Sequence, residues 1–532
     1  MDNFYYRTES IHKDQLLNLF VESPIEREII NSFKSQSHIV LEGSRGSGKS
    51  FLMKVAQTEI TNDFDNHPIM PVYVTFMQSA LIHSSEPNQF YHWMLAKIVR
   101  ETLKVLQKSG LVVSDYANSL LGTTEKNNLQ EIVSKFEESY KKPYTGIDVD
   151  TLPELSEVID AIEEICDENS VTRMVFFFDE SAHVFRPEQQ RQFFTLFRDF
   201  KSPYISCNAA VYPGVTHYGS SFEMTHDAIF KRIDRDLLSV NYVVEMEEMV
   251  LKQGGEVWAK SIKSQKELFN TLVFCAGGNP RLLLKTLDKC GKFNSASVNE
   301  VIRNFYRSDI WLEHTQLGEK YKGHKSIVDW GRSFIEDNVI PATISKNQER
   351  KSRGKSESTL YFWVSKDAPE QVKEALRLLN YTGIIRKYDS GVKATKSNIG
   401  DRFEIKFGCL ISQYTSPISN SKEIISNVKL DMFTEYGQNN TSYSSLSISD
   451  IADFSDEEFL TSLQDQLNKP IYELDLTSWQ KNKLSEINIT RISDLLDATE
   501  EDLIAKLHQV GPIRARTMKN SATAELLESI SG

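Results

Sequence analysis

The sequence lacks the two features that direct a chain into or across a membrane. It has no apolar run of about 18 residues, which a helix needs to span a bilayer. Residues 1–7 lack the basic and then apolar pattern of a secretion signal. These absences argue against a membrane partner and predict a cytoplasmic protein.

Cysteine is also scarce, and basic residues are outnumbered by acidic ones. The five cysteines form no C-x-x-C pair, which argues against a zinc site and predicts reduced thiols in the core. The net charge is −13, so any contact with nucleic acid must depend on local basic patches. The chain has 532 residues, a length that predicts about three or four domains.

The most informative stretch reads G-x-x-x-x-G-K-[ST], the pattern of a P-loop, between an expected strand at 38–41 and an expected helix at 51–56. Glycines let the backbone N–H groups face phosphate oxygens, and the following helix adds its positive N-terminal end. The pattern predicts ATP as ligand, with Lys49 at the β- and γ-phosphates and Ser50 on Mg²⁺. The predicted nucleotide contacts are Gly43, Ser44, Arg45, Gly46, Ser47, Gly48, Lys49, Ser50 and Phe51.

A second motif follows the apolar run 174–178, which predicts a buried parallel strand ending in Asp179 and Glu180. This pair resembles a Walker B element. We expect Asp179 to hold Mg²⁺ and Glu180 to deprotonate the attacking water.

Three further positions are candidates for the same site. Asn208 lies in the expected strand 204–211, where it either positions the lytic water or bonds a neighbouring backbone group. Residues 230–236 are expected at a helix end before another strand at 238–244. Either Arg232 or Arg235 there is a candidate arginine finger for a neighbouring subunit, and a solvated helix end is the alternative for each.

The stretch Gly277-Gly278-Asn279-Pro280-Arg281 breaks one helix and starts the next. Together with the P-loop and the Asp-Glu pair, it resembles the AAA+ ATPases over about residues 20–300. The G-N-P-R form is similar to the origin-recognition initiator branch and to the related STAND NTPases.

This resemblance implies an α/β P-loop ATPase core at 1–245, with an insertion at about 80–170, and a helical lid at 246–303. It also implies that Asn208 is sensor 1 and that Arg281 is a sensor 2 residue on the γ-phosphate. A structural salt bridge is the alternative for Arg281.

Residues 304–412 predict helices at 326–338 and 368–379, followed by strands at 383–388 and 401–407. This order resembles a winged-helix domain. Its hairpin offers four cations to DNA phosphates, and a basic run at 346–355 adds to their field. The alternative is a set of solvated loops. The four cations are Arg386, Lys387, Lys393 and Lys396.

Residues 413–465 are rich in serine and asparagine and predict a flexible linker. Residues 466–532 are similar to the C-terminal domain of the RNA polymerase α subunit and to other helix-hairpin-helix domains, which are small and all-α. The resemblance implies that Gly511, Arg514 and Arg516 contact a DNA phosphate. Gln509 departs from the motif's usual first glycine, and protein docking is the alternative role.

The sequence therefore predicts a Mg²⁺-dependent ATPase switch that forms a homo-oligomer and associates with double-stranded DNA. Replication initiation, a mobile element and defence against foreign DNA all fit this reading. The alternative is a STAND-type signalling scaffold, whose ATP-dependent oligomerisation recruits an effector or other partner protein without direct DNA binding.

Overall fold

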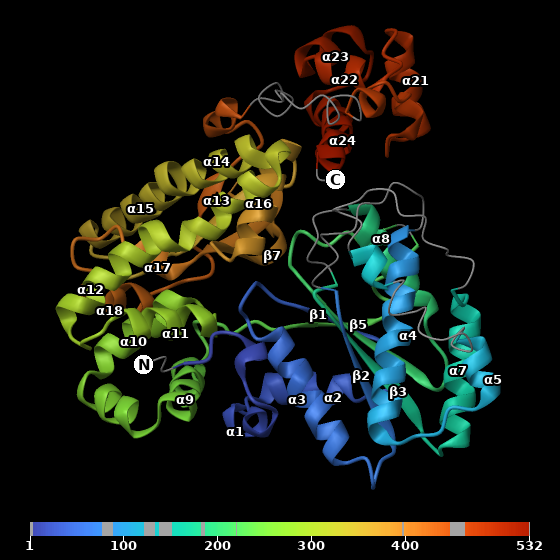
Figure 1. Ribbon diagram of the computed structural model, residues 1–532. Helices are drawn as coiled ribbons and strands as arrows, with labels where there is room; N and C mark the ends of the chain where they lie inside the picture. The colour runs from blue at the N-terminus through green and yellow to red at the C-terminus, as the bar shows by residue number, and fades with distance from the viewer. Residues whose placement is uncertain are drawn as a thin grey trace. The chain divides into compact units, whose positions relative to one another are not determined.

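The computed structural model describes residues 4–76, 89–121, 133–137, 152–181, 187–219, 221–395, 398–446 and 463–530 (Figure 1). The chain divides into two compact units. Unit 1 contains residues 1–260 and 278–284, and unit 2 contains residues 261–277 and 285–532. None of the helices in these described ranges has both the length and the apolarity that crossing a bilayer requires.

The sheet of unit 1 has five parallel strands in the order β2-β3-β4-β1-β5. They are β1 (Ile39–Glu42), β2 (Ile69–Thr75), β3 (Arg173–Asp179), β4 (Ile205–Val211) and β5 (Ile229–Arg232). β3 and β4 are interior strands whose residues are all buried, and β3 is continuously apolar from Met174 to Phe178. Pro71 is tolerated in β2 because that strand lies at the sheet edge. The arrangement is that of an α/β P-loop fold, as predicted.

Helices cover both faces of this sheet (Figure 1). On one face, α2 (Pro24–Phe33) and α3 (Lys49–Asn62) pack against Val175 and Phe177 of β3. On the other face, α4 (Gln89–Ser109), α7 (Leu155–Glu168) and α8 (Pro187–Asp199) pack against Phe176 and Phe178. Successive side chains of a strand point to opposite faces, so β3 supplies aromatic rings to both cores. The predicted insertion at about 80–170 thus supplies α4 and α7 to a layer of the fold, with α5 (Asp115–Leu120) beside α7.

The strand predicted at 238–244 is wrong. The fifth strand is β5 at Ile229–Arg232, and α9 (Tyr242–Ser264) begins within the predicted strand. Val240 is 96% exposed and Val244 is 62% exposed, so the run of β-branched residues is not buried in a sheet. β5 is short and half-polar, which suits an edge strand and conceals it from an apolar pattern.

Unit 2 contains a second sheet in the order β7-β8-β6-β9. Its strands are β6 (Tyr361–Ser365), β7 (Ile385–Lys393), β8 (Ile399–Ile405) and β9 (Thr434–Tyr436), and the predicted β7–β8 hairpin is antiparallel. The helices of unit 2 before and after this sheet's first strand are α10 (Lys266–Ala276), α12 (Ser295–Asn304), α13 (Ile310–Lys320), α14 (Lys325–Ser333), α15 (Ile340–Ser352), α16 (Glu370–Thr382), α17 (Phe407–Ile411) and α18 (Pro417–Ser426). α11 (Pro280–Lys289) begins in unit 1 and ends in unit 2.

Part of the predicted linker is folded. α18 starts with Pro417 in its first turn, and β9 adds a parallel strand beside β6. Tyr436 and Tyr443 are buried, and both rings lie near Phe334. Two aromatic anchors are enough to order a stretch whose overall composition suggests flexibility. Residues 447–462 of the predicted linker lie outside the described residues.

The C-terminal part of unit 2 is a small helical core formed by α21 (Ser478–Glu486), α22 (Ile492–Asp497), α23 (Glu500–Lys506) and α24 (Pro512–Ile530). Capping boxes at Thr477 and Thr499 begin α21 and α23. Asn520 of α24 accepts a hydrogen bond from the Glu370 N–H (3.0 Å) and donates one to the Ala368 carbonyl (3.1 Å). These bonds join α24 to the start of α16.

Candidate functional site

The P-loop connects β1 to α3 at the carboxyl edge of the parallel sheet. Gly46 has φ +80° and Gly48 has φ +107°, which are left-handed conformations that favour glycine. A Cβ at Gly43 would lie 2.3 Å from the side chain of Ile233, so this position admits no side chain. α3 begins at Lys49, and its free N–H groups make the loop an anion-binding site.

Lys49 is buried at the centre of this loop, with 6% of its surface exposed. Its ammonium donates to the carbonyl oxygens of Gly43 (2.6 Å) and Ser44 (3.3 Å) and lies 3.9 Å from the centroid of the Tyr212 ring. Burial lowers the pKa of Lys49 to about 8, against the opposing effect of the Glu180 and Asp179 carboxylates. A polyanionic ligand would favour the charged form of this lysine.

Asp179 is held by three hydrogen bonds at the end of β3. It accepts from the Ser50 hydroxyl (3.1 Å), from the Tyr73 hydroxyl and from the Glu180 N–H (3.0 Å). Burial and the Asp179 carboxylate raise the pKa of Tyr73 well above its usual value, so Tyr73 stays a donor.

The oxygens of Ser50 and Asp179 form the hard donor set that Mg²⁺ prefers, completed in P-loop proteins by phosphate oxygens and water. The residues present therefore fit this metal. Within the described ranges, no group of three or more His, Cys, Asp or Glu side chains forms a separate metal site.

Glu180 follows Asp179 with φ +58°, a left-handed conformation that is rare for a residue with a side chain. Such a conformation costs on the order of 1–3 kcal/mol and is found mainly at functional sites. Its carboxylate accepts a hydrogen bond from the Tyr212 hydroxyl (3.2 Å). Tyr212 thus contacts both Lys49 and the predicted catalytic base.

The structure contradicts the predicted position of Asn208. This residue is fully buried in the middle of β4, paired in register with Ile39 and Phe177. Its side-chain amide donates to the Phe33 carbonyl (3.2 Å), which is the alternative that the sequence left open. Tyr212, the residue after β4, lines the pocket instead. A polar residue inside an apolar run was the wrong signal, because the site lies where the strand ends.

Arg235 does not lie where an arginine finger for a neighbouring subunit would. Its guanidinium pairs with Glu26 of α2 and donates to the carbonyls of Ser47 (2.8 Å) and Gly278 (3.3 Å). Arg235 therefore joins α2, the P-loop and the G-N-P-R stretch within one chain. Arg232, on β5, is largely exposed and pairs with Glu42 of β1 (2.9 Å). It remains a predicted finger.

The G-N-P-R stretch lies against the P-loop. The Asn279 amide donates to the Arg45 carbonyl (2.8 Å), and its oxygen accepts from the Leu282 N–H at the start of α11 (3.2 Å). Arg281 lines the pocket and donates from Nε to the Tyr6 carbonyl (3.0 Å). The sensor 2 role of Arg281 stays a prediction.

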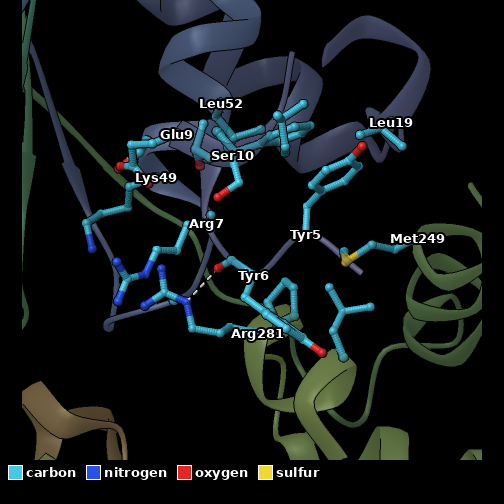
Figure 2. A pocket seen from close by; sticks show the side chains of 18 of the residues that line it. Tyr5, Tyr6, Arg7, Glu9, Ser10, Leu19, Lys49, Leu52, Met249 and Arg281 are labelled. Carbon is cyan, nitrogen blue, oxygen red and sulfur yellow. Dashed lines mark hydrogen bonds between the residues drawn. The ribbon is translucent and has the colours of Figure 1, made fainter. Parts of the chain in front are cut away.

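These groups surround one pocket of about 490 Å³ in unit 1 (Figure 2). Six of the nine predicted nucleotide contacts line it: Arg45, Gly46, Gly48, Lys49, Ser50 and Phe51. Its remaining wall includes residues 5–11, a segment for which the sequence gave no functional signal. Tyr5 holds this segment through hydrogen bonds to Gln253 (2.9 Å) and Gln15 (3.1 Å).

Residues 4–76 match the ORC-CDC6-like family model. The match spans the N-terminal segment, the P-loop and β2, a small part of the chain. Among solved structures, a Walker-type ATPase of Pyrococcus abyssi is 12% identical, with 80% of this chain and 99% of that one covered and a TM-score of 0.39. The ORC1 protein of Aeropyrum pernix, in complex with DNA, is 14% identical, with 77% and 95% covered and a TM-score of 0.28.

TM-scores this low support no conclusion about the activity of this chain. No curated protein has a significantly similar sequence. The geometry of the pocket therefore carries the functional argument.

The predicted DNA contacts of the hairpin are mostly paired with acidic neighbours. Arg386 pairs with Glu404 (2.6 Å), and Lys387 pairs with Asp401 (2.6 Å). Lys393 is exposed at the end of β7. Lys396 lies outside the described residues.

In the C-terminal helices, Arg516 pairs with Glu500 and donates to the carbonyls of Asp367 and Gln438 at 3.0 Å, so it holds α24 in place within unit 2. Arg514 donates to the Gln509 carbonyl (2.6 Å). Gln509 itself has φ +67°, the conformation that the motif's usual glycine adopts easily. Apart from its two chain neighbours, no described residue would lie within 4 Å of a side chain at Gly511, so this turn faces open space.

Proposed function

We propose that the protein is an ATPase switch that binds ATP with Mg²⁺ in the pocket of unit 1. One observation carries this proposal: the P-loop lysine, the Ser50–Asp179 oxygen pair and the Glu180 carboxylate line or adjoin a single pocket at the carboxyl edge of a parallel sheet. Chance would not bring these four groups, from two stretches of sequence that lie about 130 residues apart, to one place.

In this mechanism each group acts on the triphosphate. The P-loop N–H groups and Lys49 bind the phosphates. Ser50 and Asp179 would hold Mg²⁺, which when bound would supply positive charge beside the terminal phosphates. Glu180 accepts a proton from the attacking water. Tyr212 orients Glu180 through its hydroxyl, and Arg281 contacts the terminal phosphate from the G-N-P-R helix.

We further propose that the switch associates with double-stranded DNA through unit 2 and works as a homo-oligomer, with Arg232 reaching the next subunit. The exposed Lys393 and the open turn at Gly511 support a DNA contact. Its place in replication initiation, in a mobile element or in defence against foreign DNA follows from the resemblance alone.

The ion pairs of Arg386, Lys387 and Arg516 favour a second candidate. Because acidic partners already satisfy these cations, they contribute less to a phosphate-binding surface. In this alternative the protein is a STAND-type scaffold, whose ATP-dependent oligomerisation recruits a partner protein through unit 2. The net charge of −13 fits a protein partner equally well.

ATP hydrolysis measured with and without duplex DNA at low salt separates the two candidates. We expect Mg²⁺-dependent turnover, and several-fold stimulation by DNA if DNA is the activating ligand. Lys49→Ala is the control and should abolish ATP binding, because no other side chain replaces its ammonium in the loop. Normal ATP affinity in Lys49→Ala would refute the site. Turnover that DNA does not change would favour the scaffold.

A further inference from the structure

The N-terminal segment contributes a cation to the pocket that none of the sequence motifs accounts for. Arg7 lines the pocket together with Lys49 and Arg281. In Figure 2 the guanidinium groups of Arg7 and Arg281 point toward the same side of the pocket as the Lys49 ammonium. Arg7 thus adds a cation from outside the motifs to the side of the pocket that Lys49 and Arg281 share.

Arg7 is exposed, and no residue in the described ranges forms an ion pair or side-chain hydrogen bond with its guanidinium. Its situation differs from that of Arg235, which Glu26 neutralises in the same pocket. Like charges that converge repel one another, and the carboxylates of Glu180 and Asp179 offset part of the positive charge at Lys49. An anion of high charge would relieve this repulsion.

The backbone around Arg7 is held on both sides. Before it, the Phe4 ring lies 5.4 Å from the ring of Trp258, and the Tyr6 carbonyl accepts from Arg281. After it, the Ser10 N–H donates to the Arg7 carbonyl (3.1 Å) in a turn that begins at Thr8. The segment therefore presents Arg7 at a defined place and is not a loose tail.

We propose that Arg7 binds the terminal phosphates of the nucleoside triphosphate, as a third cation beside Lys49 and Arg281. This inference rests on the proposed function and adds to it a residue from outside the P-loop fold. Because Arg7 contacts the last phosphate in this proposal, it distinguishes a triphosphate from a diphosphate, which lacks that phosphate and its charge. ATP binding then fixes the N-terminal segment across the pocket.

The test measures the affinity of the full-length protein for ATP, ADP, AMP and pyrophosphate by titration calorimetry. Arg7→Ala should weaken ATP binding about tenfold, which is the loss expected for one charge-assisted hydrogen bond. ADP should lose clearly less and AMP nothing. Arg7→Lys should keep part of the ATP affinity. Lys13→Ala removes an equal charge from the same segment outside the pocket lining and should match the wild type.

Equal losses for ATP, ADP and AMP would overturn the proposal, since Arg7 would then only shape the segment. Unchanged ATP affinity in Arg7→Ala would also overturn it. A loss for pyrophosphate as large as for ATP would support it, because it would place Arg7 on the phosphates alone. A wild-type protein that binds no ATP would instead refute the proposed function itself.

A second measurement uses the wild-type chain, so it does not depend on the folding of a variant. Trypsin cleaves after arginine, and the Arg7–Thr8 bond is next to an exposed side chain. ATP should slow this cleavage, whereas AMP at saturating concentration should not. Cleavage at the same rate with ATP and with AMP would overturn the proposal.

Discussion

At the scale of single residues, the pocket depends on side chains that act on other side chains. Tyr212 donates to the Glu180 carboxylate and places its ring beneath the Lys49 ammonium. Tyr73 does the same for Asp179, with the Lys54 ammonium 3.1 Å from its ring centroid. Each of the two acidic residues of the Asp-Glu pair thus has its own tyrosine.

Tyr212→Phe tests whether the hydroxyl positions the catalytic base. The substitution removes the bond to Glu180 and keeps the ring under Lys49. We expect kcat to fall about tenfold, the effect of one hydrogen bond of about 1.4 kcal/mol. The Kd for ATP should stay unchanged, which steady-state kinetics and titration would show together.

Tyr212→Ala is the matched comparison, because it also removes the ring and should weaken ATP binding as well. A phenylalanine variant with wild-type kcat would show that the hydroxyl does not orient Glu180.

At the scale of elements, Arg235 joins three parts of unit 1 that lie far apart in sequence. The Arg235–Glu26 pair is almost fully buried, with side-chain exposures of 10% and 7%. A buried pair contributes little net stability, but loss of one partner leaves the other charge uncompensated. The pair therefore makes the geometry of the P-loop depend on α2 and on the G-N-P-R stretch.

Arg235→Ala should lower the Tm by about 6 °C or more. The transition to follow is the one whose Tm rises when ATP is added. The reason is the uncompensated Glu26 charge, at roughly 3 kcal/mol or more. Arg232→Ala is the control, because that arginine is 66% exposed on its side chain and should change the Tm by about 1 °C or less. Differential scanning fluorimetry measures both.

If Arg235 were an arginine finger, its loss would lower ATPase activity and not the Tm. ATPase activity restored by mixing Arg235→Ala with Lys49→Ala protein would show that Arg235 acts across subunits. That result would contradict a role for Arg235 within one chain.

The helices and strands also show which parts of the fold could be predicted from the sequence. The P-loop, the strand ending in Asp179 and the β7–β8 hairpin could be predicted, because tight turns and fully buried strands leave local patterns. The edge strand β5 could not, because an edge needs little apolar surface. Tyr212 was missed although the expected strand 204–211 ended at the correct residue, because the polar Asn208 inside the strand drew the prediction away from the residue that follows it. The role of residues 5–11 depends on contacts with residues more than 200 positions away, such as Gln253 and Trp258, and no local pattern carries those.

At the scale of the whole molecule, the two units arrange their charged side chains differently. Unit 1 gathers cations around one pocket, where the proposed nucleotide would bind. Unit 2 pairs three of the five described cations predicted for DNA with acidic neighbours. An acidic protein can still bind DNA if a few unpaired cations approach phosphates closely.

Lys393→Ala tests this view, because Lys393 is the exposed cation at the end of the hairpin strand. If the hairpin contacts DNA, the variant should bind duplex DNA more weakly, whatever its sequence. The slope of log affinity against log salt should fall by about 1 in magnitude, as one phosphate contact is lost. Fluorescence anisotropy at several salt concentrations measures this slope.

Lys325→Ala, which removes an exposed lysine already paired with Asp329 on α14, is the control and should leave the slope unchanged. Identical slopes in the wild type and Lys393→Ala would exclude the hairpin as the contact.

The backbone at Glu180 has an evolutionary consequence. Because its left-handed φ suits glycine better than any residue with a side chain, an exchange to glycine at this position would gain some stability. Under the proposed function, selection for hydrolysis would retain the glutamate. In a lineage that keeps nucleotide binding but no longer needs turnover, position 180 would drift first, while Lys49 and Asp179 stayed. A glutamate at position 180 would then indicate a descendant that still hydrolyses ATP, and another residue there would indicate one that only binds it.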